Sequence, residues 1–254
     1  MRLILIGATA FVASLVSGLL GLGGAVLVIP AYLYLPDLVG VPPLGIRNVS
    51  GMTSVQVLAS SLLGMWIHRH RGCVNARLAL TMGIPITAAA FGGALVSTVV
   101  PPDLIVGVFA SMAILGAWLM VTTKWCEETE GTLTYNRGGA VAIATGVGFL
   151  GGIVGAPGAF LLSPLMMTVL KIPTRVTIGT TLGVVVLSAF ATSAGKLFTG
   201  QVPLLETAVA VTASLPGVYL GSRVSFACSP RLLRFVLAAV IVAVGVEMWY
   251  QILF

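Results

Sequence analysis

The sequence has few charged residues and little cysteine. Asp, Glu, Lys and Arg make up 8% of its 254 residues, against 58% hydrophobic residues and a mean hydropathy of +1.10. A chain with so few charges cannot cover a soluble surface. Its three cysteines, Cys73, Cys126 and Cys228, have neither metal-site spacing nor a paired pattern, so we expect reduced thiols in apolar surroundings. The composition therefore excludes a soluble protein and predicts an integral membrane protein.

Acidic residues are absent from the middle of every predicted membrane span, since Glu206 and Glu247 both fall toward span ends. Proton and cation carriers typically place carboxylates there, so this absence argues against such a relay. No P-loop lysine follows the glycine clusters, and no nucleophile has a neighbouring base. We therefore expect no enzyme activity, no cofactor, no metal site and no nucleic-acid partner. Most basic residues lie in loops, so we attribute the net charge of +6 to residues that set the membrane topology.

Glycine is abundant, and it gathers in two copies of one segment, residues 18–30 and 152–164. We call these the first and second glycine-rich segments. Gly18, Gly21, Gly24, Ala25, Leu27 and Pro30 recur 134 positions later as Gly152, Gly155, Gly158, Ala159, Leu161 and Pro164. Glycine weakens a helix, so each copy predicts a break in a membrane helix.

The repeat continues beyond these segments at an offset of 128, where Arg47, Gly51 and Thr53 match Arg175, Gly179 and Thr181. We infer two homologous halves, residues 1–123 and 138–254, joined by a loop at 124–137. Each half is predicted to begin with a broken segment, about 3–35 and 138–170, followed by three transmembrane helices. Those helices are expected at about 48–67, 78–100 and 103–123, and at about 176–197, 204–222 and 231–252.

Each broken segment is too long for one straight crossing. A helix of about 33 residues would measure about 50 Å, against a hydrocarbon core of about 30 Å. One alternative is a tilted, broken crossing, which makes the halves parallel and divides the basic residues seven to six between the two sides. The other is a re-entrant hairpin, which inverts the second half and divides them ten to three. The positive-inside rule favours inverted repeats, and the predicted fold is an all-α polytopic membrane protein.

The helix breaks are the first candidate binding site. A helix that restarts at mid-depth exposes free N–H groups and the positive end of its dipole, both of which suit an anion. Proline at a first helical position loses no hydrogen bond, which fits Pro157. The candidate residues are Gly21, Gly23, Gly24, Gly155, Pro157 and Gly158. The alternative is that the glycines Gly148, Gly151, Gly152 and Gly155 only allow close helix packing.

The second candidate is the opening of the helix that follows each break. Arg47 precedes Ser50, Thr53 and Ser54 in the first half, and Arg175 precedes Thr180 and Thr181 in the second. Hydroxyl and guanidinium donors suit an oxyanion that exchanges water for fixed donors. The alternatives are hydroxyls bonded to their own helix and arginines that snorkel to the interface.

Three further basic side chains are expected at the membrane interface. His68 and His70 follow the span at about 48–67, and a solvated pair fits them better than a metal site. Lys196 occupies the repeat position of His68, so we expect both side chains to snorkel.

These features together resemble a known family. The doubled glycine-rich segment ending in Pro30 and Pro164, the helix openings at Gly51 and Gly179, and the basic turn after the next helix are similar to the TauE/SafE sulfite-exporter family. The resemblance covers nearly all of the chain, although Pro157 departs from the more usual run of glycines. It implies a prokaryotic inner-membrane, multi-pass protein that carries sulfur-containing anions such as sulfite or small organosulfonates.

We therefore predict a secondary transporter, an exporter working by alternating access around a site between the two broken helices, with the helix starts near Gly24 and Gly158 facing one another. Its partners are the anion and the lipid bilayer. An anion channel or pore, and a membrane scaffold without transport activity, stay open as alternatives.

Overall fold

The computed structural model describes residues 1–20, 25–38, 40, 42, 44–70, 75–122, 135–156 and 159–253. Within these ranges the regular structure is α-helical throughout. The helices are α1 (Arg2–Leu20), α2 (Ala25–Leu38), α3 (Ile46–Arg69), α4 (Ala76–Val96), α5 (Pro102–Thr122), α6 (Arg137–Val154), α7 (Ala159–Thr168), α8 (Thr174–Phe198), α9 (Leu204–Ala227) and α10 (Pro230–Leu253). Six of them, α1, α4, α5, α6, α8 and α9, are long and apolar enough to cross a membrane. The predicted all-α polytopic membrane fold is confirmed.

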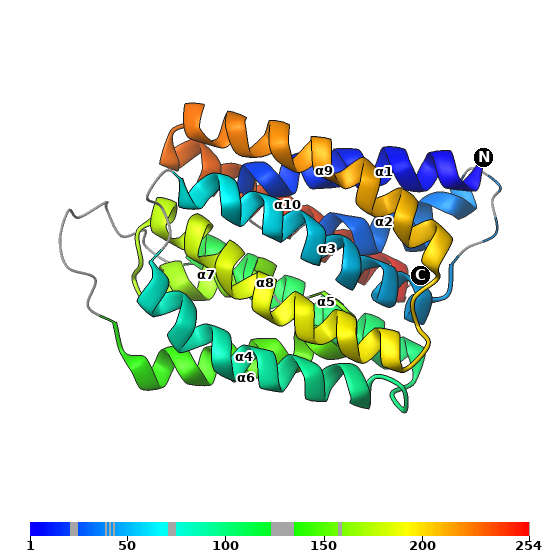
Figure 1. Cartoon of the computed structure of the whole chain (residues 1–254), viewed down its shortest axis with the longest axis horizontal. Helices are drawn as coiled ribbons and strands as arrows, with labels where there is room; N and C mark the ends of the chain where they lie inside the picture. The colour runs from blue at the N-terminus through cyan, green and yellow to red at the C-terminus, as the bar shows by residue number, and fades with distance from the viewer. Residues whose placement is uncertain are drawn as a thin grey trace.

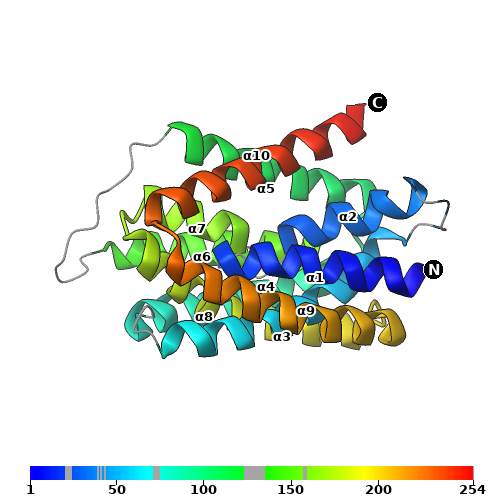
Figure 2. The ribbon, with the colours of Figure 1, turned by 90° about the horizontal axis from the view of Figure 1, so that it is seen from above.

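Each glycine-rich segment separates two helices of a hairpin. In Figures 1 and 2, α1 leads away from the N-terminus and α2 runs back toward the same end of the molecule. The pair α6 and α7 opens at the opposite end, where α6 begins and α8 also starts (Figure 1). The arms are unequal, because α1 has 19 residues and α2 has 14, while α6 has 18 and α7 has 10. The first arms, α1 and α6, have the length of a full membrane span.

The two central helices, α3 and α8, are repeat equivalents that run in opposite directions. Gly51 near the start of α3 lies against the backbone of Gln201, just beyond the end of α8, and Gly64 near the end of α3 contacts Leu182. Most of α8 is buried, and α3 buries a row of polar residues that no lipid-facing helix would carry. This central position explains why α3 is too polar to count among the six apolar helices.

Each hairpin packs its long arm on a helix of the other half, so that α1 lies against α9 and α6 lies against α4. Glycines make these contacts close: a Cβ on Gly18 would meet the backbone of Val218, and one on Gly152 would meet the carbonyl of Ala90. A side chain at either position would force the helices apart. The packing role considered for the glycines therefore holds for these two.

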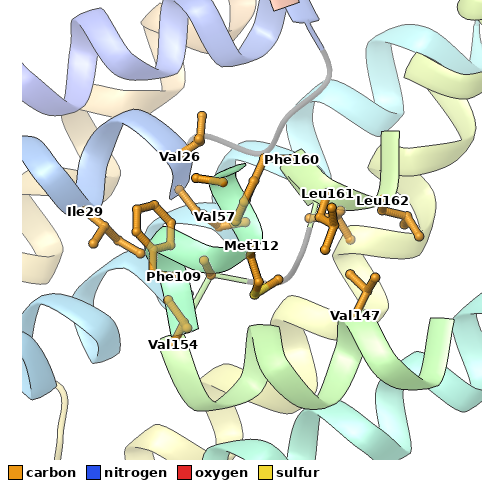
Figure 3. Packing of buried hydrophobic residues seen from close by; sticks show 14 of the residues in the cluster. Val26, Ile29, Val57, Phe109, Met112, Val147, Val154, Phe160, Leu161 and Leu162 are labelled. Atoms are coloured by element: carbon orange, nitrogen blue, oxygen red, sulfur yellow. The ribbon is translucent and has the colours of Figure 1, made fainter. Parts of the chain in front are cut away.

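The apolar core lies beside the second arms of the hairpins. Figure 3 shows Val26 and Ile29 of α2 close to Phe109 and Met112 of α5 and to Phe160 of α7. The rings of Phe109 and Phe160 meet edge to face with centroids 5.3 Å apart, a favoured aromatic geometry. This cluster joins the two hairpins.

Candidate functional site

The second helix break packs directly against the start of α3. Gly155 ends α6 in the left-handed conformation, with φ of 79°, and its N–H donates to the carbonyl of Gly151 at 2.9 Å. Glycine is the usual residue for this helix-ending geometry. A Cβ on Gly155 would meet both the hydroxyl and the carbonyl oxygen of Ser50. The structure thus brings together two candidate residues that are 105 positions apart in the sequence.

The hydroxyls at the start of α3 are buried, and two of them lack partners. Ser50 and Thr53 are fully buried, and neither hydroxyl has a hydrogen-bond partner in the described part of the chain. Ser54 differs, because it donates to the carbonyl of Gly51 in its own helix at 2.7 Å. A buried hydroxyl without a partner costs about 1 to 3 kcal/mol, so Ser50 and Thr53 offer unused hydrogen-bonding capacity beside the break.

The corresponding residues of α8 contact other segments. Thr180 accepts a hydrogen bond from the N–H of Asn75 at 3.0 Å, at the start of α4. Thr181 lies 3.3 Å from the sulfur of Met166 on α7. Because α3 and α8 are antiparallel, their hydroxyl-rich starts lie toward opposite ends of the pair, so these threonines do not share a site with Ser50.

The remaining candidates are placed only in part. Arg47 is exposed, and its Nη2 donates to the carbonyl of Val100 at 3.3 Å. The side chain of Arg175 lies outside the described residues. The whole of each of five further candidates lies outside the described residues: Gly21, Gly23, Gly24, Pro157 and Gly158.

Lys196 is the functional candidate that sequence reasoning missed. Its side chain is 0% exposed, and Nζ donates to three oxygens: Ser97 Oγ at 2.7 Å, Gln201 Oε1 at 3.0 Å and the Ile153 carbonyl at 3.3 Å. The expectation that it snorkels was wrong, because the ends of α4 and α6 and the chain after α8 enclose the ammonium. Its position at the end of a predicted span had suggested an interfacial residue.

His68, the repeat equivalent of Lys196, is also buried. It is 2% exposed, its ring lies 4.7 Å from that of Phe226, and its Nε2 has no partner among the residues described. The expected solvated pair of His68 and His70 is therefore wrong for His68, whereas His70 is exposed. The repeat alignment was the signal that linked Lys196 and His68, but it carried no information on burial.

A second buried polar network joins the first hairpin to α3. The hydroxyl of Tyr32 donates to Gln56 Oε1 at 3.0 Å, and Nε2 of Gln56 donates to Ser14 Oγ at 3.4 Å. These three residues come from α2, α3 and α1, so the network ties the arms of the hairpin to the central helix. The sequence pattern did not single them out.

Among the described residues, the charged side chains placed near the second break are basic, Lys196 and Arg47. Within the described ranges the one ion pair joins Arg2 and Glu206 at 3.5 Å, at the partly exposed start of α9. No group of three His, Cys, Asp or Glu side chains that could hold a metal ion occurs in the same ranges. The arrangement around Gly155, Ser50 and Lys196 therefore offers hydrogen-bond donors and positive charge, which suit an anion.

Proteins similar to this chain are named as membrane transporters. The chain is 22% identical over 260 residues to a "Probable membrane transporter protein" of Methanocaldococcus jannaschii, covering 97% of this chain and 94% of the relative. It is 27% identical over 219 residues to "Probable membrane transporter protein YdhB" of Bacillus subtilis, covering 84% of this chain and 86% of the relative. No solved structure matches. Residues 6–248 match the family model "Sulfite exporter TauE/SafE", so this multi-pass membrane transporter belongs to the TauE/SafE sulfite-exporter family.

Proposed function

We propose that the protein is a secondary transporter of the prokaryotic inner membrane that exports small sulfur-containing oxyanions, such as sulfite or small organosulfonates. The anion is held at a helix break and the hydroxyl-bearing start of the adjacent central helix, while the two halves alternate between inward and outward access. The observation that carries this proposal is that Gly155 packs against Ser50, where the hydroxyls of Ser50 and Thr53 are buried without hydrogen-bond partners among the described residues.

The chemistry of this region supports an anion rather than a cation. Hydroxyls and cationic groups donate hydrogen bonds to oxyanions, whereas a cation needs carbonyl or carboxylate oxygens free to coordinate it. The oxygens that face Lys196 are already engaged with its ammonium.

We further propose that the two halves are inverted repeats across the membrane. The opposite directions of α3 and α8, and the hairpins that open at opposite ends (Figure 1), support this relation. Inverted repeats with broken helices are a common plan in secondary transporters.

Cysteine accessibility tests the topology, in variants that each carry one cysteine because every other native cysteine is replaced by serine. Single cysteines at His70→Cys, at the native Cys228 and at Phe198→Cys report the ends of α3, α9 and α8. We expect His70→Cys and Cys228 to react from the same side and Phe198→Cys, 82% exposed in the wild type, from the other. Labelling of His70→Cys and Phe198→Cys from one side would indicate parallel halves.

Sulfite flux in proteoliposomes tests the transport site. Ser50→Ala and Thr53→Val remove the unpartnered hydroxyls, and we expect a raised KM for sulfite, by roughly tenfold for a lost hydrogen bond to a charged group. Ser111→Ala is the matched control, because that exposed hydroxyl donates to the Gly107 carbonyl of its own helix at 2.8 Å. Unchanged KM in both site variants would contradict the site.

Two measurements separate the rival functions. Saturable counterflow is expected of a carrier, whereas unitary currents in planar bilayers would identify an anion channel. A scaffold would show neither flux nor sulfite-dependent thermal stabilisation.

A further inference from the structure

Lys196 is a buried cation whose described partners are all neutral. Its three hydrogen bonds go to a serine hydroxyl, an amide side chain and a backbone carbonyl. These acceptors come from the end of α4, the segment after α8 and the last turn of α6. Three acceptors satisfy the three donors of an ammonium but leave its charge uncompensated. Burying an ion without a counterion costs several kcal/mol, so an anion arriving nearby would be stabilised.

The ammonium and the unpartnered hydroxyl of Ser50 lie on the same helix break. Lys196 donates to the carbonyl of Ile153, and Gly155, two residues later, packs on Ser50. A second link runs through Gln201, whose side chain accepts from Lys196 and whose backbone lies against Gly51. The start of α3 and the end of α8 therefore meet at this break. The start of α3 brings the Ser50 hydroxyl there, and the end of α8 brings the Lys196 ammonium.

Arg47 adds a second positive charge to the same region. It lies one turn before Ser50 in α3 and donates to the carbonyl of Val100, three residues after Ser97, whose hydroxyl accepts from Lys196. A carboxylate in such a place would pair with one of them. In the described ranges, the ion pair of Arg2 and Glu206 lies elsewhere.

The repeat-equivalent position in the first half holds a histidine in place of the lysine. His68 holds the position of Lys196, with its Nε2 unpartnered and its ring against Phe226. The repeat position of Ser50 is Ile178, a buried apolar residue. Neither the ammonium nor the serine hydroxyl is thus reproduced at the repeat-equivalent positions.

We propose that Lys196 is the fixed counterion of the transported oxyanion, so that the anion binds at the second helix break and the two breaks are functionally unequal. This inference rests on the proposed function and names the charged group of its site. The ammonium supplies the attraction, while Ser50 supplies a directional donor once the anion lies between them.

Lys196 also has a purely structural role from which this one must be separated. Its bond to the Ile153 carbonyl places a cation at the C-terminal end of α6, which stabilises the helix end. Substitution of Lys196 alone is therefore expected to lower the thermal stability whether or not an anion binds. The sulfite affinity, measured separately from the stability of the unliganded protein, distinguishes the two roles.

The decisive variants are Lys196→Met and Gln201→Glu. The first removes the charge, and the second places a carboxylate where the Gln201 amide oxygen already lies 3.0 Å from Nζ. Gln201→Glu keeps the lysine and its hydrogen bonds and supplies an internal counterion. The amide donors to Ser97 and Thr199 are lost, but those hydroxyls can donate to the carboxylate instead, so we expect this variant to fold even if Lys196→Met does not. For both we expect the Kd for sulfite to rise about thirtyfold or more, in line with the loss of a desolvated charge partner.

Two controls accompany them. Lys196→Arg keeps the charge and is expected to bind sulfite more tightly than Lys196→Met by about tenfold or more. Arg137→Gln removes the same unit of charge from the exposed start of α6, and its Kd is expected to stay within about twofold of the wild-type value because exposed charges are screened.

The outcomes separate this inference from the proposed function. The counterion role would be overturned if the Kd for sulfite in Gln201→Glu, and in Lys196→Met where that variant folds, equalled the wild-type value. The proposed transport function would be unaffected by that result. Equal losses in Arg137→Gln and Lys196→Met would also overturn it, because a diffuse field would then explain the binding. A wild type that neither binds nor transports sulfite or an organosulfonate would contradict both.

Discussion

Gly155→Ala tests whether the second helix break is seated on α3. Two costs are expected. Gly155 has φ of 79°, and an L-residue in the left-handed region costs about 1 to 2 kcal/mol. The new Cβ would also meet the hydroxyl and carbonyl oxygens of Ser50, and such overpacking costs about 1 to 3 kcal/mol. The free energy of unfolding should therefore fall by about 2 to 5 kcal/mol.

The chain contains a matched control for the conformational cost. Gly200 follows the end of α8 with φ of 69°, and a Cβ there would meet nothing within 4 Å. Gly200→Ala should therefore lose only the left-handed penalty, about 1 to 2 kcal/mol. The difference between the two variants measures the contact between the break and α3.

Reversible unfolding of the detergent-solubilised protein, by heat or by titration with denaturing detergent, gives both values. Adding Ser50→Ala to Gly155→Ala should restore part of the loss, because the hydroxyl is removed while the backbone carbonyl stays. Equal destabilisation by Gly155→Ala and Gly200→Ala would refute the reasoning, since the contact with Ser50 would then contribute nothing.

Further predictions concern the packing of the first hairpin. Gly221→Ala on α9 would press a Cβ into the Leu15 carbonyl of α1 and should destabilise the protein by about 1 to 3 kcal/mol. The control is Gly146→Ala, which has open space around it and should be neutral or stabilising by up to about 1 kcal/mol. Similar unfolding curves for the two variants would contradict the close approach of α9 to α1. Gln56→Leu removes the acceptor of the Tyr32 hydroxyl and should cost about 1 to 3 kcal/mol. The double variant with Tyr32→Phe should cost less than the sum of the single changes, and strict additivity in the same assay would show that the pair is not coupled.

The helices and their breaks followed closely from the sequence. Apolar length predicted α5 at about 103–123, and the structure has Pro102–Thr122. The second glycine-rich segment predicted the end of α6 at Gly155, because glycine is tolerated where a helix must stop in the left-handed conformation. The unequal arms were not predicted, since composition marks where a helix breaks but not how deep each arm reaches.

The candidate site was only partly predictable. Gly155 and Ser50 were both singled out by local pattern, and the structure adds that they touch. Thr180 and Thr181 carry the same pattern but contact Asn75 and Met166. Sequence periodicity cannot distinguish these cases, because the partners come from other helices.

Hydropathy alone predicted a membrane protein, and the recurring residues, such as Arg47 with Arg175, predicted two homologous halves that each begin with a broken helix. These properties are local: hydropathy, glycine content and spacing act within one segment. Only the tertiary structure decided that Lys196 and His68 are buried rather than interfacial. Their enclosure depends on which helices end beside α8 and α3. A charge at the end of a span faces water or protein according to its neighbours, and for Lys196 those neighbours are Ser97, Ile153 and Gln201.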